Sequence, residues 1–272
     1  MTDALLQVEG LGLDVPDLSA GRRRAAPPRT ILNDVHFTLP AGGALGVIGE
    51  SGSGKSSLAR ALTLLMPPQR GRVRFEGREV QRLSTGELIA YRARLQLVFQ
   101  DPMSALNPRR RVGASIVRPL EAFGRLGARR PTHVAGELLE RVGLPAHFAE
   151  RFPHELSGGQ RQRVNIARAL ALEPPALIAD EVTSGLDVSA QARIVALLEQ
   201  LRRETGLTII FISHDLSLVR SLCDDVLILR AGEVVEAAPA DQVFAAPKHS
   251  YTRDLLAAIP LPDPEPGWLD RR

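Results

Sequence analysis

Residues 49–56 read Gly-Glu-Ser-Gly-Ser-Gly-Lys-Ser. They follow the apolar run 44–48, which suits a buried strand, and precede the helix-compatible run 57–65. The glycines let the backbone curl so that successive N–H groups point at one anion, and the next helix adds its positive N-terminal end. Strand, loop and helix in this order predict a phosphate-binding loop, so the chain is expected to bind a nucleoside triphosphate.

Two side chains of this loop can act on a triphosphate. Lys55 can reach the β- and γ-phosphates, and the hydroxyl of Ser56 is the group that loops of this pattern place on Mg²⁺. A glycine-rich turn without a ligand is the competing interpretation. The complete pattern, set between a strand and a helix, favours the phosphate loop.

Length and composition bound the class of protein. The 272 residues suit one large α/β domain, or a core with a smaller insert and a tail; 44% hydrophobic residues is ordinary for a globular chain.

No basic start precedes a long apolar run, and no stretch approaches the ~20 apolar residues that span a bilayer. We expect a chain that is neither secreted nor membrane-spanning. Cys223, the single cysteine, allows no internal disulfide and no cysteine-ligated iron–sulfur cluster.

The charge pattern gives little support to nucleic-acid binding. A formal net charge of +3 is mildly basic, the arginines are mostly scattered, and aromatic residues make up only 4%. Nucleic-acid modules join a basic stripe to a recognised fold or to stacking aromatic side chains. We therefore expect no nucleic-acid partner.

Four further apolar runs suit buried strands, at 95–99, 176–179, 208–212 and 226–229. Helical patterns lie between several of them, which predicts a largely parallel sheet covered by helices, an α/β core. Between about 101 and 153 the strand signals fade and prolines interrupt short amphipathic stretches. We expect a helical insert there.

The segment 156–160 reads Leu-Ser-Gly-Gly-Gln and opens a run with apolar residues at helical spacing. Ser157 is a natural N-cap, but two glycines at the start of a helix weaken it. They suggest that the backbone N–H groups of Gly158 and Gly159 are kept free for an anion. A second phosphate contact is our interpretation, and a plain helix cap is the alternative.

The run 176–181 is expected to be a buried strand that ends in two carboxylates. Alternation along the strand would turn Asp180 and Glu181 to different sides. Asp180 is placed to orient Mg²⁺ or its waters, and Glu181 to polarise an attacking water as general base. A solvated acidic pair is the alternative, but the chain also carries a phosphate loop.

His214 follows the predicted strand 208–212, at the carboxyl end where open α/β sheets bind ligands. Its imidazole can donate a hydrogen bond to a γ-phosphate, while a packing or capping histidine is the alternative. The neighbours Ser213 and Asp215 do not by themselves make a hydrolase triad, because triads are defined by geometry in space.

Six motifs in one order resemble the ATP-binding subunit of an ABC transporter. They are the loop 49–56, Gln100, the segment 156–160, the pair 180–181, the turn 184–187 and His214. Each could arise by chance alone, but all six in order are unlike a coincidence, and Leu-Ser-Gly-Gly-Gln is the most specific. Within this family, 99–109 and 250–256 resemble the importers of dipeptides, oligopeptides and nickel.

The resemblance implies a fold and a domain plan. The fold is expected to be α/β, a phosphate-loop NTPase with a RecA-like core sheet, an inserted helical subdomain and an antiparallel β part near the N-terminus. An ABC ATP-binding domain is expected over 4–272, with its core at 4–100 and 164–236. The helical subdomain falls at about 101–163 and a C-terminal extension at about 237–272.

The resemblance also implies a role for each site residue. The ATP contacts are Gly49, Glu50, Ser51, Gly52, Ser53, Gly54, Lys55, Ser56, Ser57 and Gln100. The Mg²⁺ ligands are Ser56, Gln100 and Asp180, and the catalytic residues are Glu181 and His214. Ser157, Gly158, Gly159 and Gln160 contact the ATP of a partner subunit, and Asp187 communicates across the dimer.

Partners and location follow from the same resemblance. ABC importers pair two ATP-binding subunits head to tail, which for this chain means two copies of itself or one copy with a homologue. Two transmembrane permease subunits and an extracytoplasmic solute-binding protein complete the assembly. The chain is expected as a peripheral subunit on the cytoplasmic face of the cell (inner) membrane. There it would hydrolyse ATP to power import of peptides, nickel or a similar small solute.

Three positions depart from the family pattern. Between residues 11 and 35 the chain has no Phe, Tyr or Trp, where family members usually stack an aromatic ring on adenine. We hypothesise that an arginine of 22–24, or Arg29, stacks there instead. Val182 stands where proline is frequent and Gly185 where alanine is usual; both spare the chemistry, and Gly185 is expected to loosen its turn.

Two other functions compete with transport. A soluble ABC-type ATPase acting on nucleic acid or ribosomes would share the phosphate loop and the segment 156–160. Chromosome-maintenance relatives need a long coiled coil where this chain has a short insert, and ribosome-acting relatives carry two ATPase units. A kinase for a small acceptor leaves the segment 156–160 unexplained.

Overall fold

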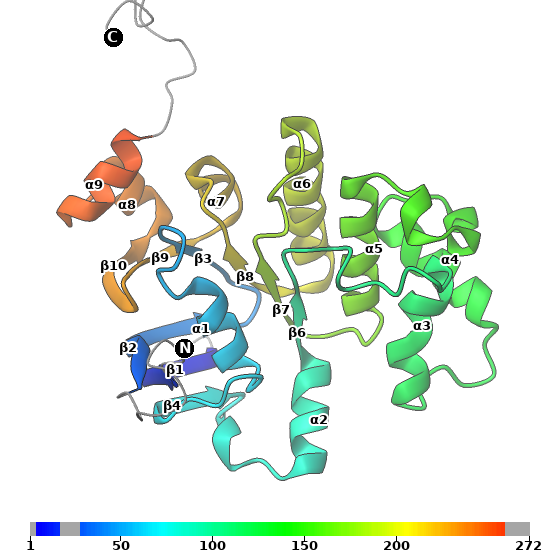
Figure 1. Ribbon diagram of the computed structural model, residues 1–272, viewed down its shortest axis with the longest axis horizontal. Coiled ribbons are helices and arrows are strands. Elements are labelled where there is room, and N and C mark those ends of the chain that lie inside the picture. Colours follow the sequence, from blue (N-terminus) through cyan, green and yellow to red (C-terminus); the bar gives the residue numbers. More distant parts are fainter. Residues whose placement is uncertain (1–3, 17–27, 259–272) are drawn as a thin grey trace, which may run out of the picture.

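The computed structural model describes residues 4–16 and 28–258, and Figure 1 shows how their elements are arranged. The strands are β1 (Ala4–Val15), β2 (Arg29–Pro40), β3 (Ala44–Ile48), β4 (Arg70–Phe75), β5 (Arg78–Glu79), β6 (Leu95–Val98), β7 (Ala176–Asp180), β8 (Thr208–Ile212), β9 (Asp225–Arg230) and β10 (Glu233–Pro239). The α-helices are α1 (Lys55–Leu62), α2 (Thr85–Arg94), α3 (Val112–Ala122), α4 (Pro131–Arg141), α5 (Gly158–Leu170), α6 (Val188–Thr205), α7 (Leu216–Leu222), α8 (Ala240–Ala245) and α9 (Ser250–Ala257). Short 3₁₀ turns are η2 (Val80–Arg82), η3 (Ala146–Glu150) and η4 (Pro153–Glu155).

The central sheet has six strands in the order β10-β9-β3-β8-β7-β6. β3 pairs in parallel with β8 and β9, and β7 pairs in parallel with β6 and β8, whereas β10 runs antiparallel to β9. Every residue of β3, β7 and β8 is buried, because helices or the second sheet cover both faces. The largely parallel α/β core that the apolar runs predict is confirmed.

A second, antiparallel sheet near the N-terminus has the order β2-β1-β4-β5. Its apolar side chains share one core with α1 and one face of the central sheet. That core includes Leu11 and Leu32 from the small sheet, Leu58 and Leu62 from α1, and Ile212 from β8. The antiparallel β part is therefore confirmed, and it covers the helix that follows the phosphate loop.

The other face of the central sheet is covered by helices. Between β6 and β7 the chain forms α3, α4 and α5, which gather at one end of the molecule in Figure 1. Ile116 of α3, Leu139 of α4 and Ala167 of α5 pack in the same core as Phe211 of β8. α5 thus returns the chain from this helical region to the sheet, where it contacts β6.

Polar side chains fix where several helices begin. Ser84 and Glu87 form a capping box at the start of α2, and Ser157 and Gln160 form another at the start of α5. Asp187 accepts a hydrogen bond from the Ala190 N–H and so caps α6. Among the helices of 4–16 and 28–258, none combines the length and apolar character needed to cross a bilayer.

Candidate functional site

The loop 49–54 lies between β3 and α1 and opens onto a cavity of about 380 Å³. Gly54 has φ +109°, and a Cβ there would come within 2.9 Å of the Leu32 side chain. Gly52 has φ +80°, and a Cβ there would meet nothing within 4 Å. Gly54 therefore lets the loop pack against β2, while the space around Gly52 stays open.

Most of the predicted ATP contacts lie around this cavity. Its lining residues are Arg29, Ile31, Ser51, Gly52, Gly54, Lys55, Ser56, Ser57, Gln100 and Glu181. The chain places these side chains together from β2, the phosphate loop, α1 and the ends of β6 and β7. Such a cavity at the carboxyl ends of parallel strands is where α/β sheets bind ligands.

Lys55 is the buried cation of the site. Its side chain is only 5% exposed, and its Nζ donates hydrogen bonds to the carbonyls of Gly49 at 2.7 Å and Glu50 at 2.8 Å. It also lies 3.8 Å from the carboxylate of Glu181. Burial lowers the pKa of Lys55, while the nearby acidic groups, Glu181 first, oppose that shift. The lysine is held close to its own loop and can be released toward an anion.

Asp180 and Ser56 form a second pair beneath the cavity. The hydroxyl of Ser56 donates to Oδ1 of Asp180 at 3.0 Å, and Asp180 is 4% exposed. Burial raises the pKa of Asp180, and the hydrogen bond from Ser56 opposes that shift. Two oxygen ligands are thus fixed side by side, and this donor set fits Mg²⁺, which binds hydroxyl, carboxylate and water oxygens.

Glu181 lies outside the strand in which the sequence places it. The apolar run predicts a strand that includes both carboxylates and separates them by alternation, but β7 ends at Asp180. Glu181 has φ +48°, in the left-handed region, and starts a turn in which the Ser184 N–H donates to its carbonyl. This backbone turn, rather than the pleat of a strand, points the Glu181 side chain toward Lys55.

His214 lies at the same edge of the sheet but is exposed. The Ser213 N–H donates to the Val47 carbonyl, which ties the end of β8 to the strand before the phosphate loop. His214 is not one of the residues that line the cavity. Asp215 caps α7, so its carboxylate is already used by the amides of Ser217 and Leu218.

The segment 156–160 begins α5. The Ser157 hydroxyl accepts from the Gln160 N–H at 3.3 Å, and Oε1 of Gln160 accepts from the Ser157 N–H at 2.9 Å. The N–H groups of Gly158 and Gly159 are in the first turn, where a helix provides no acceptor. The glycines also have a packing role, because a Cβ on Gly158 would lie 3.1 Å from the Leu186 side chain.

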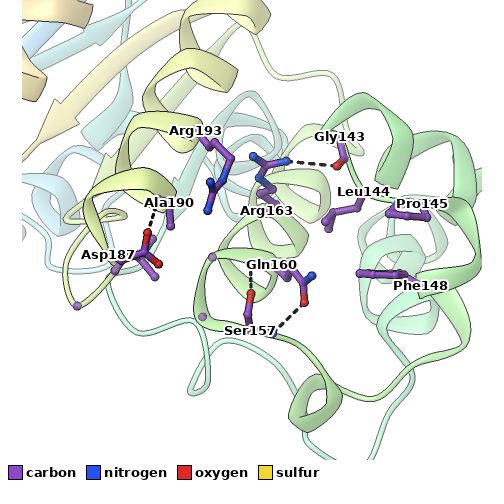
Figure 2. A pocket seen from close by; sticks show the side chains of 14 residues that line it. Gly143, Leu144, Pro145, Phe148, Ser157, Gln160, Arg163, Asp187, Ala190 and Arg193 are labelled. Atoms are coloured by element: carbon purple, nitrogen blue, oxygen red, sulfur yellow. Dashed lines mark hydrogen bonds between the residues drawn. The ribbon is translucent and has the colours of Figure 1, made fainter.

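This segment lines a different cavity, of about 490 Å³, together with the turn that holds Asp187 (Figure 2). Its lining residues are Gly143, Leu144, Pro145, Phe148, Ser157, Gly158, Gly159, Gln160, Arg163, Gly185, Leu186, Asp187, Ala190 and Arg193. No residue lines both this cavity and the one at Lys55. One chain therefore holds the two predicted phosphate contacts apart.

Several residues of these cavities were not predicted from the sequence. Arg163 donates to the carbonyls of Val142 and Gly143 in the second cavity, and Arg193 lies beside it in Figure 2. Ile31 lines the first cavity next to Arg29, the hypothesised adenine contact. The arginines 22–24 lie outside the described residues. Gly185 has φ +71°, a conformation in which the alanine expected from the family would be strained.

A phosphate loop at the edge of a central α/β sheet, with a small antiparallel sheet over its helix, defines a phosphate-loop nucleotide-binding domain. A family model described as "ABC transporter" matches residues 32–184, more than half of the chain. The chain belongs to the ABC transporter family.

Two curated relatives illustrate the likeness. The "Probable peptide ABC transporter ATP-binding protein" y4tS of Sinorhizobium fredii is 49% identical over 99% of this chain and 76% of its own length. The glutathione import ATP-binding protein GsiA of Escherichia coli is 44% identical over 96% of this chain, which spans 42% of GsiA. The predicted resemblance to ABC transporter ATP-binding subunits is confirmed.

Two solved structures are similar to this chain over most of its length. The ATP-binding cassette MJ0796, in a dimeric post-hydrolysis state bound to ADP and Pi, is 29% identical with a TM-score of 0.75, covering 86% of this chain and 98% of that one. The cbiO1 protein of Clostridium perfringens is similar with a TM-score of 0.74, covering 90% of this chain and 92% of that one. The chain is thus an ATP-binding subunit with the ABC nucleotide-binding fold, an ATPase that hydrolyses ATP for transport.

Proposed function

We propose that this chain powers the import of peptides or a peptide-like small solute. The cargo class is supported by relatives named for peptide transport and for glutathione import. Nickel, the other cargo that the sequence suggested, has no support in these names and stays a prediction. The observation that supports an assembly of two ATP-binding subunits is that the two cavities lie apart within one chain.

A second ATP-binding subunit joins the two cavities. Neither the phosphate loop nor the Ser157–Gln160 segment surrounds a triphosphate by itself, because they line different cavities of the chain. In a head-to-tail pair, ATP on Lys55 of one subunit meets the free amides of Gly158 and Gly159 of the other. Asp187, which lines the same cavity as Ser157, communicates between the two subunits.

The remaining partners are two transmembrane permease subunits and an extracytoplasmic solute-binding protein, with this chain on the cytoplasmic face of the membrane. Phe99 and Met103 are 37% and 40% exposed on either side of Gln100, which lines the nucleotide cavity. Exposed apolar side chains next to a nucleotide-facing residue suit a contact with a permease. Gln100 then links the metal site to that contact.

The loop residues bind the triphosphate in this proposal. Lys55 leaves the carbonyls of Gly49 and Glu50 for the β- and γ-phosphates, and the N–H groups of the loop surround the anion. Ser56, Gln100 and Asp180 would hold Mg²⁺, which would neutralise charge that develops on the phosphoryl oxygens. Ser56 and Asp180 are already paired at 3.0 Å, so little rearrangement of these two side chains is required.

Glu181 acts as the general base. When Lys55 turns to the phosphates, the Glu181 carboxylate loses its ion-pair partner at 3.8 Å and can accept a proton from the attacking water. The water oxygen bonds to the γ-phosphorus as the bond to the leaving ADP oxygen breaks. His214, exposed at the end of β8, turns in to donate a hydrogen bond to the γ-phosphate.

Binding and hydrolysis drive opposite movements of the pair. ATP contacts both subunits only in the closed state, so it binds that state better than the open one. Loss of the γ-phosphate removes the difference in affinity, and the pair reopens. We keep the domain plan as a proposal, with a core at 4–100 and 164–236, a helical part at about 101–163 and an extension at about 237–272; the boundary near 163 falls within α5.

The adenine ring of ATP would pack against an arginine and an aliphatic side chain in this chain. Arg29 and Ile31, at the start of β2, line the nucleotide cavity in the place of the aromatic residue that the family leads one to expect. A guanidinium can lie flat on a ring, and an aliphatic side chain can pack against its edge. We assign these two side chains to the adenine.

Reconstituted transport tests the proposal. The chain is combined with the permease and binding-protein subunits encoded beside it, in vesicles that contain ATP, and uptake of a labelled peptide mixture and of glutathione is measured. Uptake that requires ATP and is lost with Glu181→Gln supports the proposal. ATP hydrolysis that is stimulated by DNA or ribosomes, without uptake of either solute, would establish the competing soluble ATPase.

A further inference from the structure

Tyr251, in the C-terminal helix α9, touches the phosphate loop. Its hydroxyl accepts a hydrogen bond at 3.0 Å from the N–H of Glu50, the second residue of the loop. The contact joins residues 201 positions apart, and Tyr251 is only 5% exposed. Figure 1 shows α9 next to α8, on the side of the central sheet where β10 lies. A segment far along the chain therefore reaches the phosphate loop through one hydroxyl.

The start of α9 is built to hold this tyrosine in place. Glu236 of β10 accepts from the N–H groups of Lys248 at 2.9 Å and His249 at 3.0 Å. The ring of His249 accepts in turn from the Tyr251 N–H at 3.1 Å. The guanidinium of Arg230 lies 4.8 Å from the centre of the tyrosine ring. These contacts fix the backbone and the ring, and so they fix the hydroxyl.

The Tyr251 hydroxyl holds the N–H of the peptide between Gly49 and Glu50, and Nζ of Lys55 holds the carbonyl of the same peptide, that of Gly49, at 2.7 Å. The carbonyl of Glu50 accepts from Nζ of Lys55 at 2.8 Å and from the Ser53 N–H at 3.1 Å. Once Lys55 turns to a triphosphate, the carbonyls of Gly49 and Glu50 both lose the lysine, whereas the bond from the Glu50 N–H to Tyr251 can persist. Among the residues that the structure describes, Tyr251 is then the side chain that still bonds the backbone at the start of the loop.

We propose that Tyr251 is a positioning residue of the nucleotide site, which presets the phosphate loop and makes α9 part of that site. The inference rests on the proposed role of Lys55 and the loop in binding ATP. A loop held in its binding shape loses less freedom when the anion arrives, so the anchor raises affinity for ATP. Because the contact does not involve the phosphates themselves, we expect it to strengthen ground-state binding more than the chemical step.

The second tyrosine of the chain provides a matched control. Tyr91 is also 5% exposed, and its hydroxyl donates to the carbonyl of Leu62 at the far end of α1. Tyr251→Phe and Tyr91→Phe each remove one hydroxyl that bonds the backbone near α1 and keep the ring. Only the first of these hydroxyls touches the phosphate loop.

The test measures the Kd and KM for ATP, kcat, the thermal midpoint and amide exchange at Glu50 in both variants. For Tyr251→Phe we expect Kd and KM to rise about three- to tenfold, as loss of one hydrogen bond allows, with kcat nearly unchanged and faster exchange at Glu50. For Tyr91→Phe we expect a lower thermal midpoint with wild-type Kd and KM. Wild-type Kd in Tyr251→Phe, or equal increases of Kd in both variants, would overturn the inference.

Lys55→Ala separates this inference from the proposed site. If Lys55→Ala loses ATP binding while Tyr251→Phe keeps wild-type affinity, the anchor alone is wrong. If Lys55→Ala keeps wild-type affinity for ATP, the proposed role of the loop is wrong, and the inference about Tyr251 is wrong with it.

Discussion

The ammonium of Lys55 lies 3.8 Å from the carboxylate of Glu181, so the group that we assign to the phosphates holds the group that we assign to the attacking water. Both side chains are shielded, at 5% and 17% exposure. A triphosphate that draws Lys55 away must therefore also release Glu181. This pairing links the binding of substrate to the availability of the base, and it leads to the first two predictions.

Glu181→Gln is expected to keep ATP binding and to lose nearly all turnover, because an amide keeps the shape of the side chain but accepts no proton from water. ATP then stays bound and holds the paired subunits closed. Binding, phosphate release and the size of the assembly with ATP are measured together. Glu140→Gln, an exposed residue of α4, serves as the control and should hydrolyse ATP at the wild-type rate. Hydrolysis by Glu181→Gln close to that rate refutes the role of base.

Lys55→Ala is expected to lose nucleotide binding itself, since it removes the charge that we assign to the phosphates. Lys55 and Lys248 are the two lysines of the chain, and the Lys248 side chain is exposed on the loop before α9. Lys248→Ala should therefore bind ATP as the wild type does. Titration with ATP and with ADP distinguishes the variants. Similar affinity for ATP in both variants counts against the role of Lys55.

Ser157→Ala tests the contact across the dimer. The change removes the N-cap of α5, which costs about 1 kcal/mol, and in the proposed dimer it also removes the hydroxyl that we assign to the ATP of the partner. Ser84 caps α2 in the same capping-box arrangement, in a part of the fold that lines neither cavity of the proposed site. Ser84→Ala is therefore the matched control.

We expect both serine variants to lose a similar amount of unfolding free energy, whereas only Ser157→Ala loses ATP-driven pairing and hydrolysis. ATP binding to the isolated subunit should survive in both, because the phosphate loop is untouched. Equal ATPase rates in the two variants would show that Ser157 acts as a helix cap alone.

The sequence predicted the fold well where a pattern is local. β3 and β8 begin and end at the residues that the apolar runs mark, since a strand buried on both faces needs an unbroken apolar run. The loop 49–56 was equally clear because glycine, lysine and serine serve one ligand within a single turn. The family resemblance supplied the antiparallel sheet, whose pairing of β1 with β4 joins segments some sixty residues apart.

The features that the sequence did not predict depend on contacts between residues far apart along the chain, which no short stretch of sequence contains. Tyr251 bonds Glu50 across 201 positions, and Arg163 and Arg193 line one cavity because α5 packs against α6. The turn at Glu181 was mistaken for strand because a left-handed glutamate has no sequence signal of its own. Tertiary packing decides these positions, and the sequence stretch 250–256 was useful only as a mark of the subgroup.

Stability at low pH should report the capping box of α2. The Ser84 N–H and hydroxyl and the Arg78 guanidinium lower the pKa of Glu87 from 4.5 to about 2. A carboxyl group whose pKa is lower in the folded state stabilises the fold at pH values above its pKa in the unfolded state. This stabilisation is lost as the pH falls toward its pKa in the folded state. The contribution of Glu87 is therefore complete above about pH 4.5 and disappears toward pH 2.

Glu87→Gln keeps an acceptor at the cap but cannot titrate. Urea unfolding of both proteins between pH 7 and pH 3 should show the wild type more stable at pH 7, with the difference shrinking below pH 4.5. A difference that stays constant down to pH 3 contradicts the assigned pKa.

Arg29→Ala tests the adenine platform. Arg29 lines the nucleotide cavity, so loss of its guanidinium should weaken ATP binding about two- to fivefold, as removal of an exposed cation–π contact does. Arg72 of β4 is exposed and lines neither cavity of the proposed site, so Arg72→Ala should bind ATP normally. Inorganic triphosphate, which has no base, should bind Arg29→Ala as it binds the wild type. If ATP affinity is unchanged in Arg29→Ala and after alanine replacement of each arginine at 22–24, an arginine does not replace the missing aromatic ring.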